Sequence, residues 1–334
     1  MSDSVSRESR LTEPSSVYSS VQAAVDDIVI GNERVIEGLT IAILTRGHVL
    51  LEGVPGVAKT TIANAFSRAL GVGYSRVQMT PDLLPADITG SYIYRESTGE
   101  FELQRGPIFS NIVVADEINR ATPKTQSALL EAMQERQVTL EGDTLRLPDP
   151  FFVIATQNPI EMEGTFELAE AQRDRFLVKY VIEPPNRDQE LTMIDRFDSE
   201  PDLTPESITE AVDNETLSTA REQITDVYVS EPIREYILDI VHATRSDSRL
   251  EYGGSPRATL AFLNGGKARA AINERDYVLP TDIKTLAEPV LRHRLIRNTD
   301  ARLSDRSVID ILQDIVESVP APGSDVSFEV PTDD

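Results

Sequence analysis

Short apolar runs alternate with amphipathic stretches along the first half of the chain. Four runs lack the polar alternation of a solvent-facing strand, which predicts strands buried on both faces of a parallel sheet. They are His48–Leu51, Ile112–Ala115, Phe151–Ala155 and Phe176–Val181. The pattern predicts an α/β core over residues 18–184, in which helices flank a parallel sheet.

Two further segments of this core alternate around a turn and predict β-hairpins. The connecting turns contain Gly99 and Gly142. The predicted strand pairs are Ser91–Tyr94 with Phe101–Leu103, and Val138–Leu140 with Thr144–Leu147.

After Pro184-Pro185 the apolar spacing becomes helical, which predicts a separate, all-helical domain over residues 185–319. Residues 1–17 and 320–334 are poor in apolar side chains and predict disordered tails, the second of them acidic. The predicted helices are Arg187–Phe197, Pro205–Ala211, Asn214–Thr225, Glu231–Thr244, Pro256–Ala271, Thr281–Ala287 and Ser304–Glu317.

A glycine-rich turn that ends in Lys-Thr follows the first apolar run, as in a phosphate-binding P-loop. Backbone N–H groups of such a turn, with the start of the next helix, bind phosphate oxygens. Lys59 is expected to reach the β- and γ-phosphates and the Thr60 hydroxyl to hold Mg²⁺. Ala58 stands where most P-loops have Gly. The predicted nucleotide-binding residues are Gly53, Val54, Pro55, Gly56, Val57, Ala58, Lys59, Thr60 and Thr61.

The second apolar run ends in two carboxylates, Asp116 and Glu117. Asp116 is expected to bind Mg²⁺, directly or through water, and Glu117 to orient or deprotonate the attacking water. Together with the P-loop, this pair predicts an enzyme that hydrolyses ATP, with ATP and Mg²⁺ as its cofactors.

A polar residue after the third apolar run is a candidate for holding the attacking water and the γ-phosphate. Asn158 is the first choice, and Thr156 and Gln157 are alternatives. An Asn before Pro is also common as a turn residue.

Two arginines are candidates for neutralising transition-state charge. Arg175, with Arg173 as the alternative, precedes the last core strand and is expected to project towards the nucleotide of a neighbouring subunit. Arg257 opens a predicted helix of the second domain and is expected to reach the phosphates when that domain closes.

The charge composition limits the classes of protein to which this chain can belong. The chain has 56 Asp+Glu against 32 Lys+Arg, a net charge of −24, and its lysines are few. This excess resembles the adaptation of halophilic archaea to high salt; the alternative is an acidic cytosolic protein of an ordinary mesophile. A generic basic surface for nucleic acid is absent.

Cysteine and apolar segments exclude further classes. With no cysteine and three scattered histidines, neither disulfides nor a zinc site is expected. The sequence has no apolar run of membrane-spanning length and no signal peptide, which predicts a cytoplasmic protein without a membrane partner.

Taken together, residues 18–320 resemble an AAA+ ATPase of the MoxR group. The most specific segments are Asp82–Asp87, Ala115–Glu135, Gln157-Asn158-Pro159 with Glu163-Gly164-Thr165, and Ser255-Pro256-Arg257. The resemblance implies that the P-loop is a Walker A motif and that Asp116-Glu117 belongs to Walker B. It likewise implies sensor 1 for Asn158, the arginine finger for Arg175, sensor 2 for Arg257, and adenine contacts for Ile30 and Gly31.

The resemblance also implies a homo-oligomeric ring, usually a hexamer, that acts as a chaperone. Such rings remodel or mature protein complexes or insert metals and cofactors, often with a partner that carries a von Willebrand factor A domain. The client is unknown, and the two hairpins are candidates for gripping it or for structural rims. Alternatives are a chelatase-like or gas-vesicle-type ATPase subunit and a helicase-type nucleic-acid motor, although neither hairpin carries a clear basic cluster.

Overall fold

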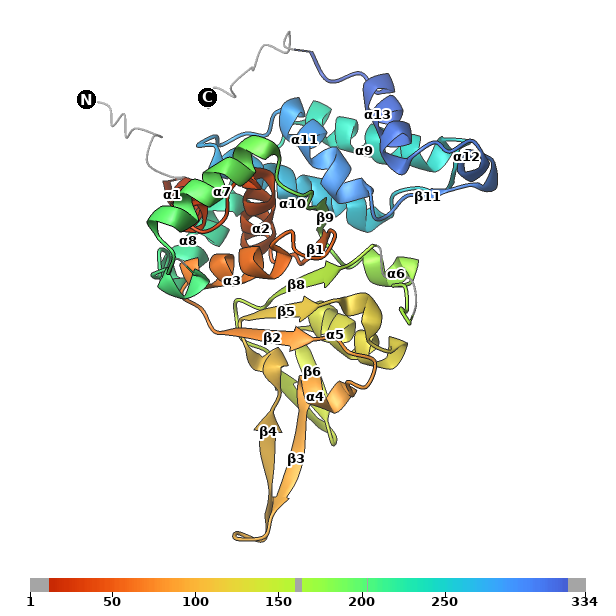
Figure 1. The fold of residues 1–334 in the computed structure, drawn as a ribbon. Coiled ribbons are helices and arrows are strands. Elements are labelled where there is room, and N and C mark those ends of the chain that lie inside the picture. The colour runs from red at the N-terminus through yellow and green to blue at the C-terminus, as the bar shows by residue number, and fades with distance from the viewer. Residues whose placement is uncertain (1–11, 160–163, 203, 324–334) are drawn as a thin grey trace, which may run out of the picture.

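The computed structural model describes residues 12–159, 164–202 and 204–323. Its centre is one parallel sheet with the strand order β2-β5-β8-β1-β9 (Figure 1). The strands are β1 (Val49–Glu52), β2 (Tyr74–Gln78), β5 (Ile112–Asp116), β8 (Phe152–Gln157) and β9 (Val178–Val181). The predicted parallel α/β fold is therefore confirmed, with all four predicted strands present.

The fifth strand of the sheet, β2, was not predicted. It lies at the edge, next to β5, and only Val77 is buried among its five residues. Because its other side chains are exposed or half-buried, β2 lacks the continuous apolar run by which the other four strands were recognised.

Different helices cover the two faces of the sheet. Alternate side chains, such as Val49 and Leu51, share a core cluster with α2 (Glu33–Leu44) and α3 (Lys59–Ala69). The intervening side chains, such as Leu50 and Val113, belong to a second cluster with α5 (Pro123–Glu135) and the short α4 (Pro85–Thr89). This alternation follows from the two-residue period of a strand.

Both predicted hairpins are present. The first pairs β3 (Gly90–Arg95) with β4 (Glu100–Arg105), and the second pairs β6 (Gln137–Leu140) with β7 (Asp143–Arg146). Figure 1 shows the first hairpin extending far from the body of the molecule. The Tyr92 hydroxyl donates to the Asp143 carboxylate over 2.7 Å and so connects the two hairpins.

The second half of the chain is helical, apart from a short antiparallel pair of strands. This pair consists of β10 (Leu250–Tyr252) and β11 (Ile296–Arg297). The helices are α7 (Arg187–Ser199), α8 (Asn214–Thr225), α9 (Glu231–Ser246), α10 (Pro256–Ile272), α11 (Pro280–Leu291), α12 (Thr299–Leu303) and α13 (Val308–Ser318). In the part of the chain that the structure describes, no helix is long and apolar enough to cross a membrane.

Two predicted helices of this half are corrected. The one predicted over 205–211 is only a 3-10 turn, Pro205–Ser207, because the N–H groups of Ala211 and Val212 bond to the Ala69 carbonyl at the end of α3. The one predicted from Ser304 begins at Val308, because the Ser307 side chain caps it by accepting the Asp310 N–H.

The N-terminal tail prediction is also corrected. Residues 12–17 are not a tail but the first part of α1 (Thr12–Asp26), which packs on α8 and α10. Pro14, Val17, Val21 and Val25 are buried at helical spacing, and this stripe holds the helix to the body despite its polar composition. Residues 1–11 and 324–334 of the predicted tails lie outside the described residues.

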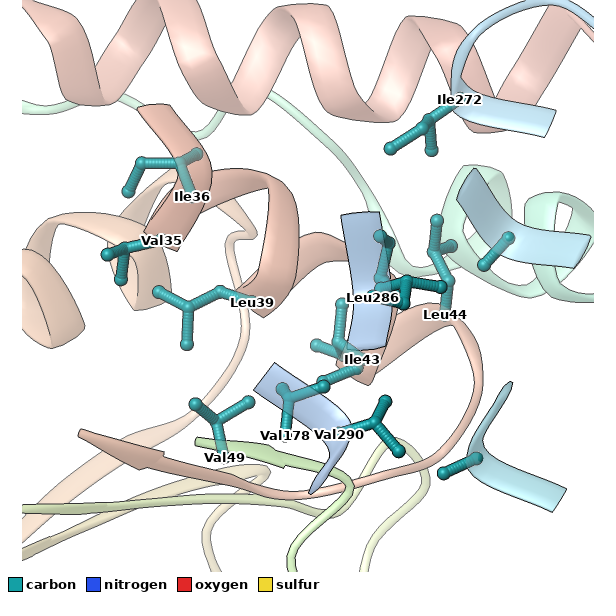
Figure 2. Packing of buried hydrophobic residues seen from close by; sticks show 14 of the residues in the cluster. Val35, Ile36, Leu39, Ile43, Leu44, Val49, Val178, Ile272, Leu286 and Val290 are labelled. Carbon is teal, nitrogen blue, oxygen red and sulfur yellow. The ribbon is translucent and has the colours of Figure 1, made fainter. Parts of the chain in front are cut away.

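The helical half packs directly on the α/β core through α2. Figure 2 shows Leu39 and Ile43 of α2 beside Val49 and Val178 of the sheet, with Leu286 and Val290 of α11 in the same cluster. The two parts therefore share a continuous hydrophobic core.

Candidate nucleotide-binding and hydrolysis site

The P-loop connects the carboxyl end of β1 to α3, which begins at Lys59 as predicted. Gly56 has φ 86°, a conformation that favours glycine. A Cβ on Gly53 would lie 2.6 Å from the Ile182 carbonyl oxygen, so only glycine lets these two segments approach. Ala58 adopts the left-handed region at φ 61°, a strain of roughly 1–2 kcal/mol for alanine, and so keeps the backbone course that glycine usually provides.

The Lys59 ammonium group is held inside this loop. Its Nζ donates to the carbonyl oxygens of Gly53 and Val54 over 2.5 and 2.9 Å, and only 9% of the residue is exposed. The loop therefore brings the Lys59 ammonium group close to the N-terminal N–H groups of α3, which no side chain caps. Such an arrangement is suited to binding a phosphate.

Asp116 lies at the carboxyl end of β5, beside the start of α3. Its Oδ2 accepts a hydrogen bond from the Thr60 hydroxyl over 3.1 Å, and its Oδ1 accepts one from Thr156 over 2.6 Å. Burial on its own raises the pKa of Asp116, but hydrogen bonds from Thr156, Arg76 and Thr60, with the Arg76 charge, outweigh burial and lower this pKa.

These groups fit a magnesium ion. A hydroxyl and a carboxylate oxygen 3.1 Å apart are hard ligands of the kind that Mg²⁺ uses together with phosphates and water. Such a site needs few protein ligands. Among the described residues there is no group of three or more His, Cys, Asp or Glu side chains that could hold a metal ion. Thr60 and Asp116 would therefore hold Mg²⁺ with a nucleotide.

Glu117 follows Asp116 in the left-handed conformation, with φ 58° and ψ 52°. Its Oε2 accepts hydrogen bonds from Gln78 Nε2 over 2.7 Å and from Arg120 Nη1 over 3.0 Å. Its backbone N–H donates to the Thr156 hydroxyl over 2.9 Å. Two side chains therefore hold this carboxylate, and Thr156 holds its backbone beside the candidate metal site.

Of the three candidates for holding the attacking water, Thr156 and Gln157 end β8 and Asn158 follows it. Thr156, an alternative in the sequence, is fully buried and contacts both Asp116 and Glu117. Asn158 is 3% exposed and lies at the same carboxyl edge of the sheet. Glu163, part of the motif that follows, lies outside the described residues.

Arg76 and Gln78 of β2 complete the surroundings of the two carboxylates, and sequence reasoning did not find them. Arg76 pairs with Asp116 over 2.5 Å and Gln78 with Glu117. A usable signal was their spacing of two residues, which puts both side chains on one face of a strand.

A cavity of about 970 Å³ between the start of α2, the end of β9 and the start of α7 is a candidate for the adenine site. Its walls include Ile30, Asn32, Asn186 and Gln189, the last two at the start of α7. Gly31 has φ 74°, and a Cβ there would lie 2.4 Å from Gln189 Nε2. The predicted Ile30-Gly31 segment is thus close to α7 and to the end of β9.

The candidate arginines lie at the opposite edge of the sheet. Arg175 and Arg257 line one cavity of about 320 Å³ with Gly47 and His48, which precede β1. Arg173 does not line this cavity, which favours Arg175 of the two alternatives. Five arginines face a single carboxylate there; they are Arg46, Arg136, Arg175, Arg257 and Arg294, with Asp174. We call this the arginine cavity.

Asp174 holds the arginine cavity together. It accepts hydrogen bonds from Arg294 Nε over 2.7 Å and from the Ser255 hydroxyl over 2.9 Å, which brings the start of α10 to the segment before β9. Arg257 is exposed there and donates to Gln134 Oε1 over 3.3 Å. The Nε of Arg175 is buried and makes no hydrogen bond.

In this arrangement of the two domains, Arg257 lies far from the P-loop of its own chain. β1 separates the P-loop from the arginine cavity, and its four residues span about 13 Å. Arg257 and Arg175 therefore lie together at the amino edge of the sheet, and contact of Arg257 with the phosphates on domain closure stays a prediction.

The chain has the fold of an AAA-type ATPase. A family model described as "ATPase family associated with various cellular activities (AAA)" matches residues 48–178, and one for the AAA lid domain matches residues 242–315. A crystal structure of a putative ATPase from Cytophaga hutchinsonii superposes with a TM-score of 0.85 at 40% identity, and covers 93% of this chain and 97% of its own.

Within this class, curated relatives identify the family. The chain is 40% identical to chaperone MoxR1 of Mycobacterium tuberculosis over 89% of its length and 80% of the relative. It is 33% identical to protein MoxR of Methylorubrum extorquens over 88% of its length and 92% of the relative. An uncharacterised protein, YeaC of Bacillus subtilis, is 42% identical, with 89% and 92% covered. The chain belongs to the MoxR family of AAA+ ATPases.

Proposed function

We propose that this protein hydrolyses Mg²⁺-bound ATP in a homo-oligomeric ring, in which each site is completed by two arginines of the adjacent subunit. One observation carries the proposal: Arg175 and Arg257 share a cavity at the edge of the sheet opposite the P-loop. A basic cavity in a chain of net charge −24 suits an anion, and the anion is the nucleotide of the neighbour. A hexamer is the expected size of the ring.

At the carboxyl edge of the sheet, each residue of the site has its own role in ATP hydrolysis. The P-loop and Lys59 would bind the triphosphate, and Thr60 and Asp116 would hold Mg²⁺, which would supply positive charge to the phosphates. Glu117 orients the attacking water and takes its proton, and Asn158 holds this water from the adjacent strand. Arg175 of the next subunit then neutralises the charge that develops on the γ-phosphate.

A mixing experiment tests the arrangement between subunits. Lys59→Ala removes phosphate binding and Arg175→Ala removes the arginine, so each variant alone is expected to lose most ATP turnover. Rings mixed from the two contain interfaces with an intact P-loop on one side and an intact arginine on the other, and turnover should return in part. Arg302→Ala, an exposed position on α12, serves as the control partner.

No recovery on mixing, with assembly of mixed rings confirmed by a size measurement, would contradict the shared site. Full turnover by the Arg175→Ala variant alone would show that this arginine has no part in it.

We infer that the ring acts as a chaperone on other proteins. The name of the relative from M. tuberculosis supports this inference. The proposal also includes an unknown client protein and a separate partner that carries a von Willebrand factor A domain. Insertion of metals or cofactors into the client is a further part of it. Deleting the Thr98-Gly99 turn of the first hairpin should reduce activity on a client without changing basal ATP turnover; unchanged client activity would remove that hairpin from the mechanism.

A further inference from the structure

Arg76 binds the carboxylate oxygen that the metal would need. Its Nη2 and Nε lie 2.5 and 3.2 Å from Asp116 Oδ2, the same oxygen that the Thr60 hydroxyl contacts over 3.1 Å. The other oxygen, Oδ1, accepts the hydrogen bond of Thr156. A guanidinium group therefore occupies the side of Asp116 that faces Thr60.

We propose that Arg76 is a built-in counter-cation that competes with Mg²⁺ for Asp116 and leaves when the ion enters with ATP. This inference rests on the proposed function of the site. The Asp116 side chain is only 8% exposed, so its charge needs a partner whenever no metal ion is bound. Arg76 supplies that partner from β2.

The surroundings of Arg76 allow it to leave. Its side chain is 49% exposed and projects from the edge strand of the sheet, so the guanidinium group can return to water at little cost. A second acceptor is already in place, because Arg76 Nη2 also donates to Gln78 Oε1 over 3.2 Å. A divalent ion on Oδ2 would repel the guanidinium group at such short range and drive this exchange.

The competition makes metal binding depend on the nucleotide. One carboxylate and one hydroxyl give Mg²⁺ too few ligands to displace Arg76, whereas the phosphate oxygens of ATP add both ligands and negative charge. The free site would therefore exclude divalent ions that arrive without ATP. Removal of Arg76 should weaken this exclusion.

The test compares Arg76→Ala with Arg68→Ala in the full chain. Arg68 lies on α3 and pairs with Glu206 at the surface, so its loss controls for removing an arginine near the site. Binding of Mn²⁺ to the nucleotide-free protein is followed by electron paramagnetic resonance. Binding of a fluorescent ATP analogue is then titrated with Mg²⁺, starting in EDTA.

Arg76→Ala is expected to bind Mn²⁺ without nucleotide at least about fivefold more tightly than wild type, and to lower the Mg²⁺ midpoint by a similar factor. Arg68→Ala should match wild type. Thermal unfolding confirms that each variant is folded, and Arg76→Gln, which keeps a polar side chain without the charge, replaces Arg76→Ala if that variant does not fold.

An Mg²⁺ midpoint that is unchanged or raised in the neutral variants would overturn the inference while leaving ATP binding by the wild type intact. Failure of the wild type to bind the ATP analogue at any Mg²⁺ concentration would overturn both the inference and the proposed function. The two failures are therefore distinguishable.

Discussion

At the scale of single residues, Thr156 links the two carboxylates of the hydrolysis site through one hydroxyl. Thr156→Val keeps the shape but removes the hydrogen bonds to Asp116 and from the Glu117 N–H. Because all three groups are partly or wholly buried, we expect a loss of about 1–3 kcal/mol in stability and a marked loss of ATP turnover. Thermal unfolding and a turnover assay measure both effects.

The control for this prediction is Thr139→Val, an exposed threonine of the second hairpin. It should leave stability within about 0.5 kcal/mol of wild type. A Thr156→Val variant as active as this control would exclude a role for the hydroxyl in positioning the carboxylates.

Two buried histidines predict how stability depends on pH. Burial lowers the pKa of His48 to about 4, against a hydrogen bond to the Met133 carbonyl that raises it. Burial, followed by the charge of Arg294, lowers the pKa of His293 well below its ordinary value. The unfolded chain therefore binds protons below about pH 6.5 that the folded chain does not, and stability should fall as pH drops from 6.5 towards 4.

For His48, this loss should be roughly 1.5 kcal/mol between pH 6.5 and pH 5. Denaturant unfolding at several pH values measures the slope. His48→Gln is expected to lower the free energy of unfolding at pH 7. It should also make this free energy depend less steeply on pH, because one buried histidine no longer contributes. His242→Gln, at an exposed position, should keep the full slope; equal slopes in both variants would contradict the assignment.

At the scale of elements, Asp174 ties α10 and Arg294 to the segment before β9. The Arg294 side chain is 3% exposed, so Asp174→Ala would leave a buried guanidinium group without its carboxylate and destabilise the protein by about 3–5 kcal/mol. Arg257 would also lose its place beside Arg175. We therefore expect ATP turnover to fall while nucleotide affinity stays near that of wild type, because the P-loop is untouched.

Asp314→Ala is the matched control, since Asp314 is an exposed residue of α13 that also pairs with two arginines, Arg249 and Arg306. It should cost no more than about 1 kcal/mol. If Asp174→Ala unfolds at the same temperature as this control, the lid is held by its apolar contacts and not by Asp174.

At the scale of the whole molecule, the net charge of −24 predicts a dependence on salt. The Debye length falls from about 10 Å at 0.1 M to about 3 Å at 1 M, so KCl should reduce the repulsion among surface carboxylates. We expect the unfolding temperature and the fraction of assembled rings to rise between 0.1 and about 1 M KCl. Calorimetry and sedimentation measure the two quantities.

An uncharged osmolyte at matched osmolality separates screening from general exclusion effects. Sucrose that stabilises the protein as much as KCl would remove the electrostatic explanation. A lower unfolding temperature in KCl would contradict adaptation to high salt.

The sequence by itself determined the features that depend on neighbouring residues in the chain. The P-loop from Gly53 to Thr60 and the Asp116-Glu117 pair are recognisable because a turn, a helix start and a strand end are local. The inner strands were equally predictable, because burial on both faces imposes a continuous apolar run. Both hairpins followed from alternation around a glycine turn.

Only the tertiary structure decided which distant groups meet. The strand order places β2 beside β5, and with it Arg76 and Gln78 beside the two carboxylates. It also placed Arg257 with Arg175, because Asp174 holds the start of α10 at the amino edge of the sheet. Hydrophobic periodicity shows which face of an element is buried, but not which elements become neighbours. That choice is made by packing between residues far apart in the chain.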